Sequence, residues 1–456
     1  MEEWSGCSLT QLHQALVSGD VTSVELTRSV LDDISSRNPH IGALVHVDSE
    51  YALARAEEID RGGYSEDFSV LRGVPTADKD LVRRVGMPTR YGSRTRLNRE
   101  PEGESDDMAL WVDSVGAVSV GKTATSEFGM AGYTEPLLGG PVSHPLHPTR
   151  QVGGSSGGAA AAVAAGFFAF APGSDGGGSI RIPALACGIV GWKPSRGLIP
   201  AGSGLESPGG LAVPGLLTRS VSDLSLAAPE LLRGEWEWAT RATSGDDSPP
   251  TRVGVTTRSP WPSSWGIAPD EDSRAAFGRA REAFESSGVD VVEIEWEPDE
   301  SYHEHFLTVW AVTAAAIDVE PDQEHLLEPL TLYLRKKAEN ISGVDFSRAL
   351  VRLKEFERAT IRAFSGVDAV LTPGLATAPP KVGFFDTDPE VNFRQQIEFT
   401  PWTSFVNVSG LPAVVQPVWK NSEGIQMGVQ LIGRPGTDLG LIELARALER
   451  TLRPSD

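Results

Sequence analysis

Cysteine is scarce in this sequence. The 456 residues include only Cys7 and Cys187, which lie far apart along the chain. Two cysteines argue against a disulfide framework and against a zinc centre built from thiolates. Cys187 is expected to be a small buried residue rather than a nucleophile.

Positive charge and long apolar runs are also in short supply. Lysine and arginine number 40 against 62 aspartates and glutamates, which gives a formal net charge of −22. Binding to nucleic acid or to an anionic membrane needs a basic surface, so neither partner is expected. The longest apolar run, residues 159–171, is too short to span a bilayer. The amino terminus lacks the basic and apolar segments of a signal peptide, which predicts a cytoplasmic protein.

Hydrophobic periodicity predicts a mixture of helices and strands. Capping-box patterns at residues 8–11 and 22–25 precede apolar residues at helical spacing, which predicts a pair of helices at the start of the chain. The β-branched run 115–120 predicts a buried strand, and the small residues 159–165 predict a closely packed helix. A strand is expected at 167–171, followed by a glycine-rich turn.

The composition changes about halfway along the chain. Residues 242–250 are rich in serine, aspartate and proline, which is typical of a surface loop or linker. Beyond them, a strand, a polar helix (270–287) and a second strand (289–294) form an α/β unit that we interpret as inserted in a larger fold. The remaining predicted elements are strands at 367–371 and 413–417 and an amphipathic helix at 440–452.

Two catalytic patterns are interpreted as coincidental. Residues 116–123 fit the Walker A pattern, but the positions between the glycines are apolar and β-branched, which favours a strand over a phosphate-binding loop. Gly153-x-Ser155-x-Gly157 fits a nucleophile elbow, which needs a strand entering the serine and a histidine late in the chain. The preceding segment does not resemble a strand. The downstream histidines all lie in polar, helix-like sequence: His303, His305 and His325.

The pair His303 and His305 does not predict a metal site. Residues two apart point to different sides of a helix, so their imidazoles diverge. No further ligands are placed by the sequence around them, and both are expected to be surface residues.

Two clusters of serine within glycine are the most informative feature of the chain, at residues 153–158 and 173–181. Glycine allows a backbone to approach a ligand closely, and serine becomes a nucleophile when a base removes its proton. Lys79 is the candidate base, but only if burial keeps it neutral. Its acidic neighbours Asp78 and Asp80 would point to the opposite face of an extended strand, away from the site.

With Lys79 and one serine from each cluster, the chain resembles the amidase signature family of serine hydrolases. The resemblance runs nearly the whole length, as far as Gly410-Leu411-Pro412-Ala413 and residues 428–433. It implies an α/β fold in which residues 1–456 form a single α/β/α-layered domain around a large mixed sheet. Residues 232–330, where the resemblance is weakest, would be an α/β and helical region inserted within that domain.

The resemblance also implies a role for each polar residue. In the family, a lysine, a serine in a cis peptide and a nucleophilic serine form the triad, which here are Lys79, Ser155 and Ser179. Four backbone amides form the oxyanion hole: those of Gly176, Gly177, Gly178 and Ser179. The implied reaction is hydrolysis of a linear amide, or a related C–N acyl bond, through a seryl acyl-enzyme without metal or organic cofactor. The expected partner is a small-molecule amide, and the expected state is a monomer or a homodimer.

Residues around the triad are interpreted in the same way. Asp175 and Arg181 resemble residues that hold the glycine-rich turn by hydrogen bonds, and Ser156 either does likewise or caps the helix after it. Phe128 and Tyr133 occupy positions where the family often lines its acyl pocket, although both fit the core equally well. Three positions depart from the usual family pattern: Leu81, Ser174 and Gly176.

Two other functions remain open on the sequence alone. The first is the amidase subunit of a tRNA-dependent amidotransferase, which releases ammonia from glutamine for a partner subunit. The acidic balance of the chain gives no sign of a tRNA-binding surface. The second is a nucleotide-binding P-loop protein, which is supported only by residues 116–123.

Overall fold

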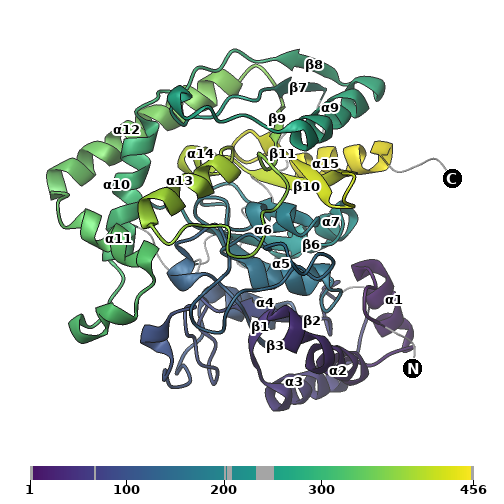
Figure 1. The fold of residues 1–456 in the computed structure, drawn as a ribbon. Coiled ribbons are helices and arrows are strands. Elements are labelled where there is room, and N and C mark those ends of the chain that lie inside the picture. Colours follow the sequence, from purple (N-terminus) through teal and green to yellow (C-terminus); the bar gives the residue numbers. More distant parts are fainter. Residues whose placement is uncertain (1–3, 66–67, 200–201, 203–207, 233–250, 453–456) are drawn as a thin grey trace.

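The fold consists of two β-sheets enclosed by helices (Figure 1). It is described by a computed structural model for residues 4–65, 68–199, 202, 208–232 and 251–452. None of the helices in these ranges is long and apolar enough to cross a membrane. The linker predicted at 242–250 lies outside the described residues.

The elements within the described ranges have the following bounds. The strands are β1 (Leu44–Val47), β2 (Pro75–Lys79), β3 (Val118–Thr123), β4 (Phe170–Asp175), β5 (Val190–Lys193), β6 (Val213–Thr218), β7 (Arg252–Val255), β8 (Asp290–Glu293), β9 (Ala369–Pro373), β10 (Ala413–Lys420) and β11 (Gln426–Gly433). The α-helices are α1 (Leu9–Ser18), α2 (Ser23–Ile41), α3 (Ser49–Gly62), α4 (Asp107–Ser114), α5 (Gly157–Ala164), α6 (Arg181–Ala186), α7 (Val221–Glu230), α9 (Glu271–Ser286), α10 (Tyr302–Ala315), α11 (Pro329–Ala338), α12 (Gly343–Phe364), α13 (Pro389–Phe399), α14 (Ser404–Ser409) and α15 (Asp438–Leu452).

The larger sheet is mixed, as the sequence predicted. In the described chain it has eight strands in the order β4-β6-β5-β10-β11-β9-β7-β8. The pairings from β4 to β9 are antiparallel, whereas β7 pairs in parallel with both β9 and β8. The predicted strand–helix–strand unit is therefore β7–α9–β8, and its strands extend one edge of this sheet rather than forming a sheet of their own.

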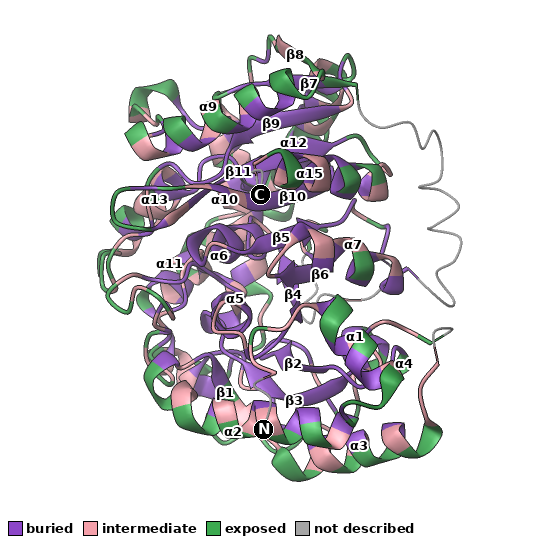
Figure 2. Ribbon diagram, turned by 90° about the vertical axis from the view of Figure 1, so that its right-hand side faces the viewer, coloured by how far each residue is buried: buried purple, intermediate pink, exposed green. Residues whose placement is uncertain are grey.

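Helices cover both faces of the larger sheet because neighbouring strand residues point in opposite directions. Val414 packs into the core beneath α7, α9 and α15, whereas Val415 packs into the core around α5 and α6. Leu216 and Leu217 divide in the same way. Most strands of this sheet are consequently buried on both faces and are drawn in purple in Figure 2, whereas the residues of the edge strand β8 are exposed or partly buried.

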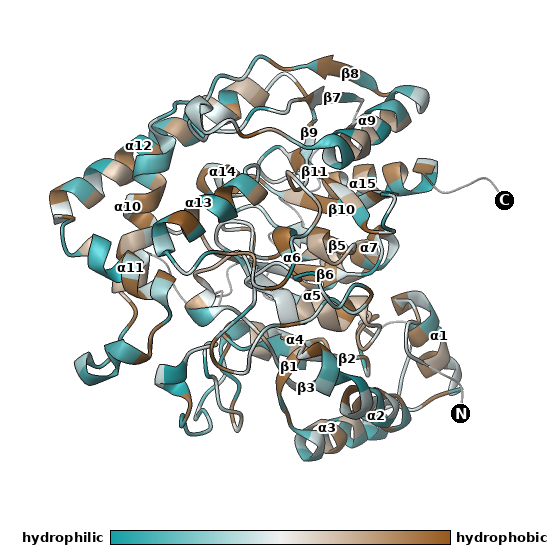
Figure 3. Ribbon diagram, viewed as in Figure 1, coloured by the Kyte–Doolittle hydropathy of each residue, from teal (hydrophilic) through white to brown (hydrophobic). Residues whose placement is uncertain are grey.

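A third core joins α10, α12 and α14 to the strands β9–β11. Helix α12 is amphipathic, with apolar and polar residues side by side along its length in Figure 3. Its buried residues recur every three or four positions, which places them on one face: Ala349, Leu353, Phe356, Thr360 and Phe364. This helical group lies beside the larger sheet, on the left in Figure 1.

The smaller sheet carries the first polar residue of the site. Its order is β1-β3-β2, with β2 parallel to β3, and α2 and α3 pack against it. Both predicted capping boxes are present, at the starts of α1 and α2. The Walker-like residues form β3, and the Lys122 side chain is buried, donating to the carbonyl of Val82 and the hydroxyl of Thr89. The interpretation of this segment as a strand is confirmed.

Helix α5 connects the two sheets through an unusually close backbone contact. The N–H of Gly158 donates to the carbonyl of Ala124 at 3.0 Å, just after β3 ends. A Cβ on Gly158 would collide with the amide nitrogen of Ala124 and the carbonyl oxygen of Ala43. Glycine is therefore required here for close approach, which fixes the start of α5 against the smaller sheet.

We expect Gly158→Ala to destabilise the protein by about 1–3 kcal/mol, because backbone atoms have to move to admit the methyl group. Gly278→Ala is the matched control, since Gly278 also lies within a helix but a Cβ there meets nothing within 4 Å. Alanine should stabilise α9 by up to about 1 kcal/mol. Urea unfolding of the two variants measures both effects, and shifts of the same sign would contradict the prediction.

Candidate active site

The three residues singled out by the sequence lie at the ends of three different elements. Lys79 is the last residue of β2, Ser155 precedes α5, and Ser179 lies in the turn between β4 and α6. Their side chains are at most 7% exposed. The peptide bond between Gly154 and Ser155 is cis. The structure thus brings together residues from both sheets and both serine–glycine clusters.

Lys79 donates hydrogen bonds only to neutral oxygens. Its Nζ lies 2.8 Å from Ser155 Oγ, 3.1 Å from Ser174 Oγ and 3.3 Å from the carbonyl oxygen of Ser174. Burial lowers the pKa of Lys79 to about 7, and the more distant charge of Asp175 opposes this shift only in part. A substantial neutral fraction of this lysine is therefore available near neutral pH.

The two acidic neighbours of Lys79 bind elsewhere: Asp78 lies on β2, where the alternation of the strand turns it away as predicted, whereas Asp80 lies in the turn that follows β2. Asp78 accepts from Arg84 and from Ser119 Oγ, the latter at 2.7 Å. Asp80 accepts from the backbone N–H groups of Arg90 and Gly92. Neither carboxylate forms an ion pair with Lys79, so the lysine keeps its lowered pKa beside two acids.

Ser156 and Ser174 tie the two serine–glycine clusters together. Ser156 Oγ donates to the carbonyl of Ser174 at 3.3 Å, and its N–H donates to the carbonyl of Ser179 at 3.1 Å. The Ser156 side chain makes no capping hydrogen bond to α5. Of the two interpretations offered for Ser156, the structure therefore favours the one in which it holds the turn in place.

A buried ion pair holds the glycine-rich turn. The Asp175 carboxylate accepts from Arg181 Nε and Nη2 at 3.0 and 2.9 Å and from the N–H groups of Gly178 and Ile180 at 2.8 and 3.1 Å. Burial alone would raise the pKa of Asp175, but the charge and hydrogen bonds of Arg181 hold it well below its usual range. The turn is consequently fixed around an ionised carboxylate.

The far side of Arg181 reaches the carboxyl-terminal half of the chain. Its remaining hydrogen bonds go to the Thr403 carbonyl, Gln430 Oε1 and Asn407 Oδ1, at 2.9, 2.7 and 2.6 Å. Asn407 also donates to Asp175. Sequence reasoning missed these partners because they lie more than 200 residues downstream. It noted Ser174 only as a departure from the family pattern, yet that residue contacts the lysine.

The amides proposed for the oxyanion hole are not equivalent. The N–H of Gly178 is occupied by Asp175. In the described part of the chain, no hydrogen bond uses the N–H of Gly176, Gly177 or Ser179. Three amides next to the Ser179 hydroxyl are thus free to bind a ligand atom.

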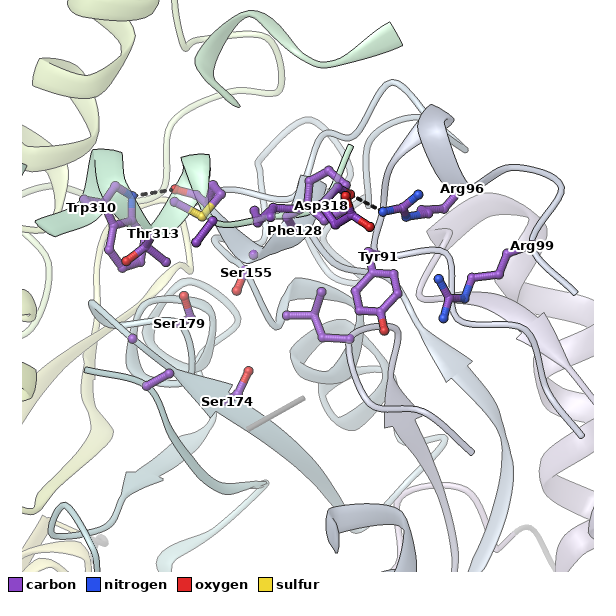
Figure 4. A pocket seen from close by; sticks show the side chains of 17 residues that line it. Tyr91, Arg96, Arg99, Phe128, Ser155, Ser174, Ser179, Trp310, Thr313 and Asp318 are labelled. Carbon is purple, nitrogen blue, oxygen red and sulfur yellow. Dashed lines mark hydrogen bonds between the residues drawn. The ribbon is translucent and has the colours of Figure 1, made fainter. Parts of the chain in front are cut away.

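Two cavities meet at Ser179. The larger, of about 310 Å³, is lined by Ser155, Ser174 and Ser179 at one end, with Arg96 and Arg99 at the other, as Figure 4 shows. The smaller, of about 60 Å³, lies on the other side of Ser179 and includes neither Ser155 nor Ser174. Its apolar wall contains Trp261, Phe306, Trp310, Phe393 and Ile397.

The two predicted pocket residues have different positions. Phe128 lines the larger cavity, where it stacks on Tyr91. Tyr133 lines neither of these two cavities. Its ring stacks on Phe385 at 4.4 Å between centroids, and its hydroxyl accepts from Asn392 at 3.0 Å. Tyr133 thus contacts Phe385 and Asn392 in this structure, and its backbone lies against Gly154.

Other polar residues that the sequence raised lie away from this centre. His303 and His305 are on α10, and no group of three or more metal-ligating side chains gathers within the described ranges. Cys187 is buried, and burial raises the pKa of its thiol, which agrees with the prediction that it is not a nucleophile.

Comparison with known proteins identifies relatives along nearly the full chain. The model of the amidase family matches residues 25–442. A protein of Mycobacterium leprae named "Putative amidase AmiC" is 31% identical over 454 residues, covering 96% of this chain and 93% of that protein. The solved structure of a 6-aminohexanoate cyclic dimer hydrolase superposes with a TM-score of 0.86 at 27% identity, covering 99% of this chain and 98% of the other. A second solved amidase gives a TM-score of 0.83 at 27% identity, with coverage of 97% and 99%.

We expect Arg181→Met to lower the free energy of unfolding by about 3–5 kcal/mol, because it leaves Asp175 charged and unpaired in the interior. Arg352→Met is the control. Arg352 pairs with Glu355 on the exposed face of α12, and such pairs contribute at most about 1 kcal/mol. Chemical denaturation of both variants provides the comparison, and equal losses would contradict the central role of the Asp175–Arg181 pair.

Proposed function

We propose that this chain, which belongs to the amidase family, hydrolyses a carboxylic amide through an acyl-enzyme on Ser179. The observation that carries the proposal is the contact between the buried Lys79 amine and Ser155 Oγ at 2.8 Å, beside the cavity that Ser179 also lines. A neutral amine, a hydroxyl that can pass a proton and a second hydroxyl are the parts that nucleophilic catalysis by serine requires.

In the proposed reaction, Ser179 Oγ attacks the amide carbon while its proton moves to Ser155 Oγ and the proton of Ser155 moves to Lys79 Nζ. Ser155 is suited to this relay because its hydroxyl can donate and accept in the same step. When the tetrahedral intermediate collapses, the same path returns a proton to the departing nitrogen. Water then attacks the ester on Ser179 with the relay acting again as base, and the carboxylic acid leaves.

The developing oxyanion would be bound by the free amides of Gly176, Gly177 and Ser179. The N–H of Gly178 would act indirectly, since Asp175 already accepts from it and thereby fixes the turn. A donor that is already oriented costs no reorganisation during the reaction, and removal of one such donor typically costs about 3–4 kcal/mol of transition-state stabilisation.

The amidase subunit of a tRNA-dependent amidotransferase would use the same proposed residues on glutamine. Glutamine and simple amides should therefore be tested side by side as substrates of this chain. If glutamine is the only amide that releases ammonia, and if this release requires partner subunits, the result favours that alternative over an independent amidase.

Ser179→Ala should lower kcat/KM for any amide substrate by at least about a thousandfold, because no other hydroxyl replaces the nucleophile. The far-UV circular dichroism should not change. Ser287→Ala, an exposed serine that contacts only the preceding turn of its helix, should retain full activity. Hydroxylamine trapping of an acyl group on intact protein but not on the Ser179 variant gives a second readout. Retained turnover in a folded Ser179→Ala protein would refute the assignment.

The pH dependence of kcat/KM should report Lys79. A lysine acts as a base only when deprotonated, so activity should rise with pH through about 7, which is the lowered pKa of Lys79. Burial also lowers the pKa of Lys193 to about 7, but this residue donates to the Pro194 carbonyl and does not contact the triad. Lys193→Met should therefore keep the midpoint of the profile. Loss of the rise in that variant, or a flat wild-type profile between pH 6 and 8, would contradict the role of Lys79.

A further inference from the structure

We propose that the substrate is an amide of a short carboxylic acid with an amine whose far end carries an anionic group, and that Arg96 binds this group. The inference rests on the proposed function and adds the orientation and charge of the substrate. It follows from the unequal cavities on the two sides of Ser179 and from an arginine at the outer end of the larger one.

The position of Ser155 decides which half of the substrate enters which cavity. The departing nitrogen has to receive its proton from the relay, and proton transfer needs hydrogen-bond distance. Ser155 lines the larger cavity and not the smaller one. The nitrogen and the group attached to it therefore occupy the larger cavity, and the acyl group occupies the smaller one.

The volume of the smaller cavity limits the acyl group. A site for one water needs roughly 10–15 Å³, so about 60 Å³ admits about four to six groups of that size. The wall of this cavity is largely aromatic and aliphatic. A short, unbranched acyl chain fits these limits, whereas a fatty acyl chain exceeds them.

Arg96 is the uncompensated cation of the larger cavity. One of its Nη groups donates to the backbone carbonyl of Asp318, while its Nε is buried without a hydrogen-bond partner. None of the ion pairs within the described ranges involves Arg96. Its other Nη group is not buried and makes no hydrogen bond within the described ranges, so this guanidinium without a carboxylate presents a free donor to an anionic oxygen of a ligand.

Arg99 does not compete for this role. Its Nε and Nη2 bind both oxygens of Glu102, at 2.8 and 3.2 Å, so its charge is already balanced. Its guanidinium lies 5.5 Å from the centre of the Tyr91 ring and helps to form the wall. The Asp318 carboxylate is exposed at the same rim of the cavity. It would repel an anion that bound at this rim without contacting Arg96.

The backbone around Arg96 is held from the triad side of the cavity. Arg96 ends the short 3₁₀ helix Arg94–Arg96, whose capping residue Ser93 donates to the buried carboxylate of Glu127 at 2.7 Å. The other oxygen of Glu127 accepts from the N–H of Glu328 at 2.8 Å, just before α11. Both sides of the rim are thus joined by buried hydrogen bonds, which lowers the cost of ordering the site when a ligand binds.

Two aromatic residues along the wall have an unusual backbone. Tyr91 (φ 54°) and Phe128 (φ 49°) are the non-glycine residues with positive φ in the described chain, and the N–H of Phe128 donates to the carbonyl of Tyr91 at 2.8 Å. Such conformations cost bulky residues about 1–3 kcal/mol each and cluster at ligand sites. Here they present two stacked rings between the serines and Arg96, so the middle of the ligand should be apolar.

Three matched probe series test the proposal. Each series consists of N-butanoyl amines whose amine part is a chain of three to eight carbons. The three series differ in the far end of this chain, which is a carboxylate, a methyl group or an ammonium group. The butanoate released is measured to give kcat/KM. At the best length, the wild-type protein should prefer the carboxylate to the methyl end by about ten- to hundredfold, the range for a hydrogen bond to a charged group. The ammonium end should be the poorest.

Variants assign the preference to Arg96. Arg96→Gln should remove the preference for carboxylate by lowering kcat/KM for the carboxylate-ended probe about ten- to hundredfold more than for the methyl-ended probe, and its far-UV circular dichroism should match that of the wild type. Arg96→Lys should restore part of the preference. Asp318→Asn, the opposite charge at the same rim, should keep or increase it. Equal losses for both probes in Arg96→Gln, or loss of the preference in Asp318→Asn, would overturn the role of Arg96.

Two further outcomes separate this inference from the proposed function. Hydrolysis of methyl-ended probes that depends on Ser179, without any preference for carboxylate, overturns the inference and leaves the proposed function standing. If no amide is hydrolysed in a reaction that depends on Ser179, both the inference and the proposed function are overturned. The last probes are mono-amides of dicarboxylic acids, in which the free carboxylate belongs to the acyl part. If Arg96→Gln impairs these instead, the assignment of the two cavities is wrong.

Discussion

The ion pair between Asp175 and Arg181 is the interaction on which the rest of the site depends. Both side chains are fully buried, and together they join the glycine-rich turn to residues from the last quarter of the chain. The pair is stable in the interior because every strong donor of Arg181 has an acceptor. Ser179 and its neighbouring amides therefore occupy one position relative to both sheets.

The same burial that requires this pairing also lowers the pKa of Lys79, the proposed base. Lys79 is excluded from water like Arg181, but it contacts hydroxyl and carbonyl oxygens rather than a carboxylate. Its charged form is therefore disfavoured, while the charged form of Asp175 is favoured close by. The alternation of β2 directs Asp78 to Arg84, and Asp80, in the turn after the strand, accepts from backbone N–H groups, so a neutral lysine lies between two acids that are bound elsewhere.

The larger cavity also separates polar from apolar groups along its length. The serine end of the larger cavity is lined by hydroxyls, and beyond them its wall contains Leu81, Tyr91 and Phe128 before it reaches Arg96. Polar groups are thus concentrated at two points separated by an apolar stretch. A ligand that matches this pattern needs a polar bond at one end of an apolar segment and an anion at the other.

The capping boxes and a strand near residues 115–120, which the structure places at 118–123, follow from local spacing. Through its resemblance to the family, the sequence by itself also determined the mixed sheet and the three residues at the centre. It did not determine the partners of Arg181, the position of Tyr133 or the charge at Arg96. Asn407 on α14 and Gln430 on β11 meet Arg181 only when these two elements pack beside α6. The two cavities likewise arise from segments that are distant along the chain, such as the 3₁₀ helix Arg94–Arg96, α10 and α13. Only tertiary packing decides such contacts, since no local pattern records which distant surfaces will meet.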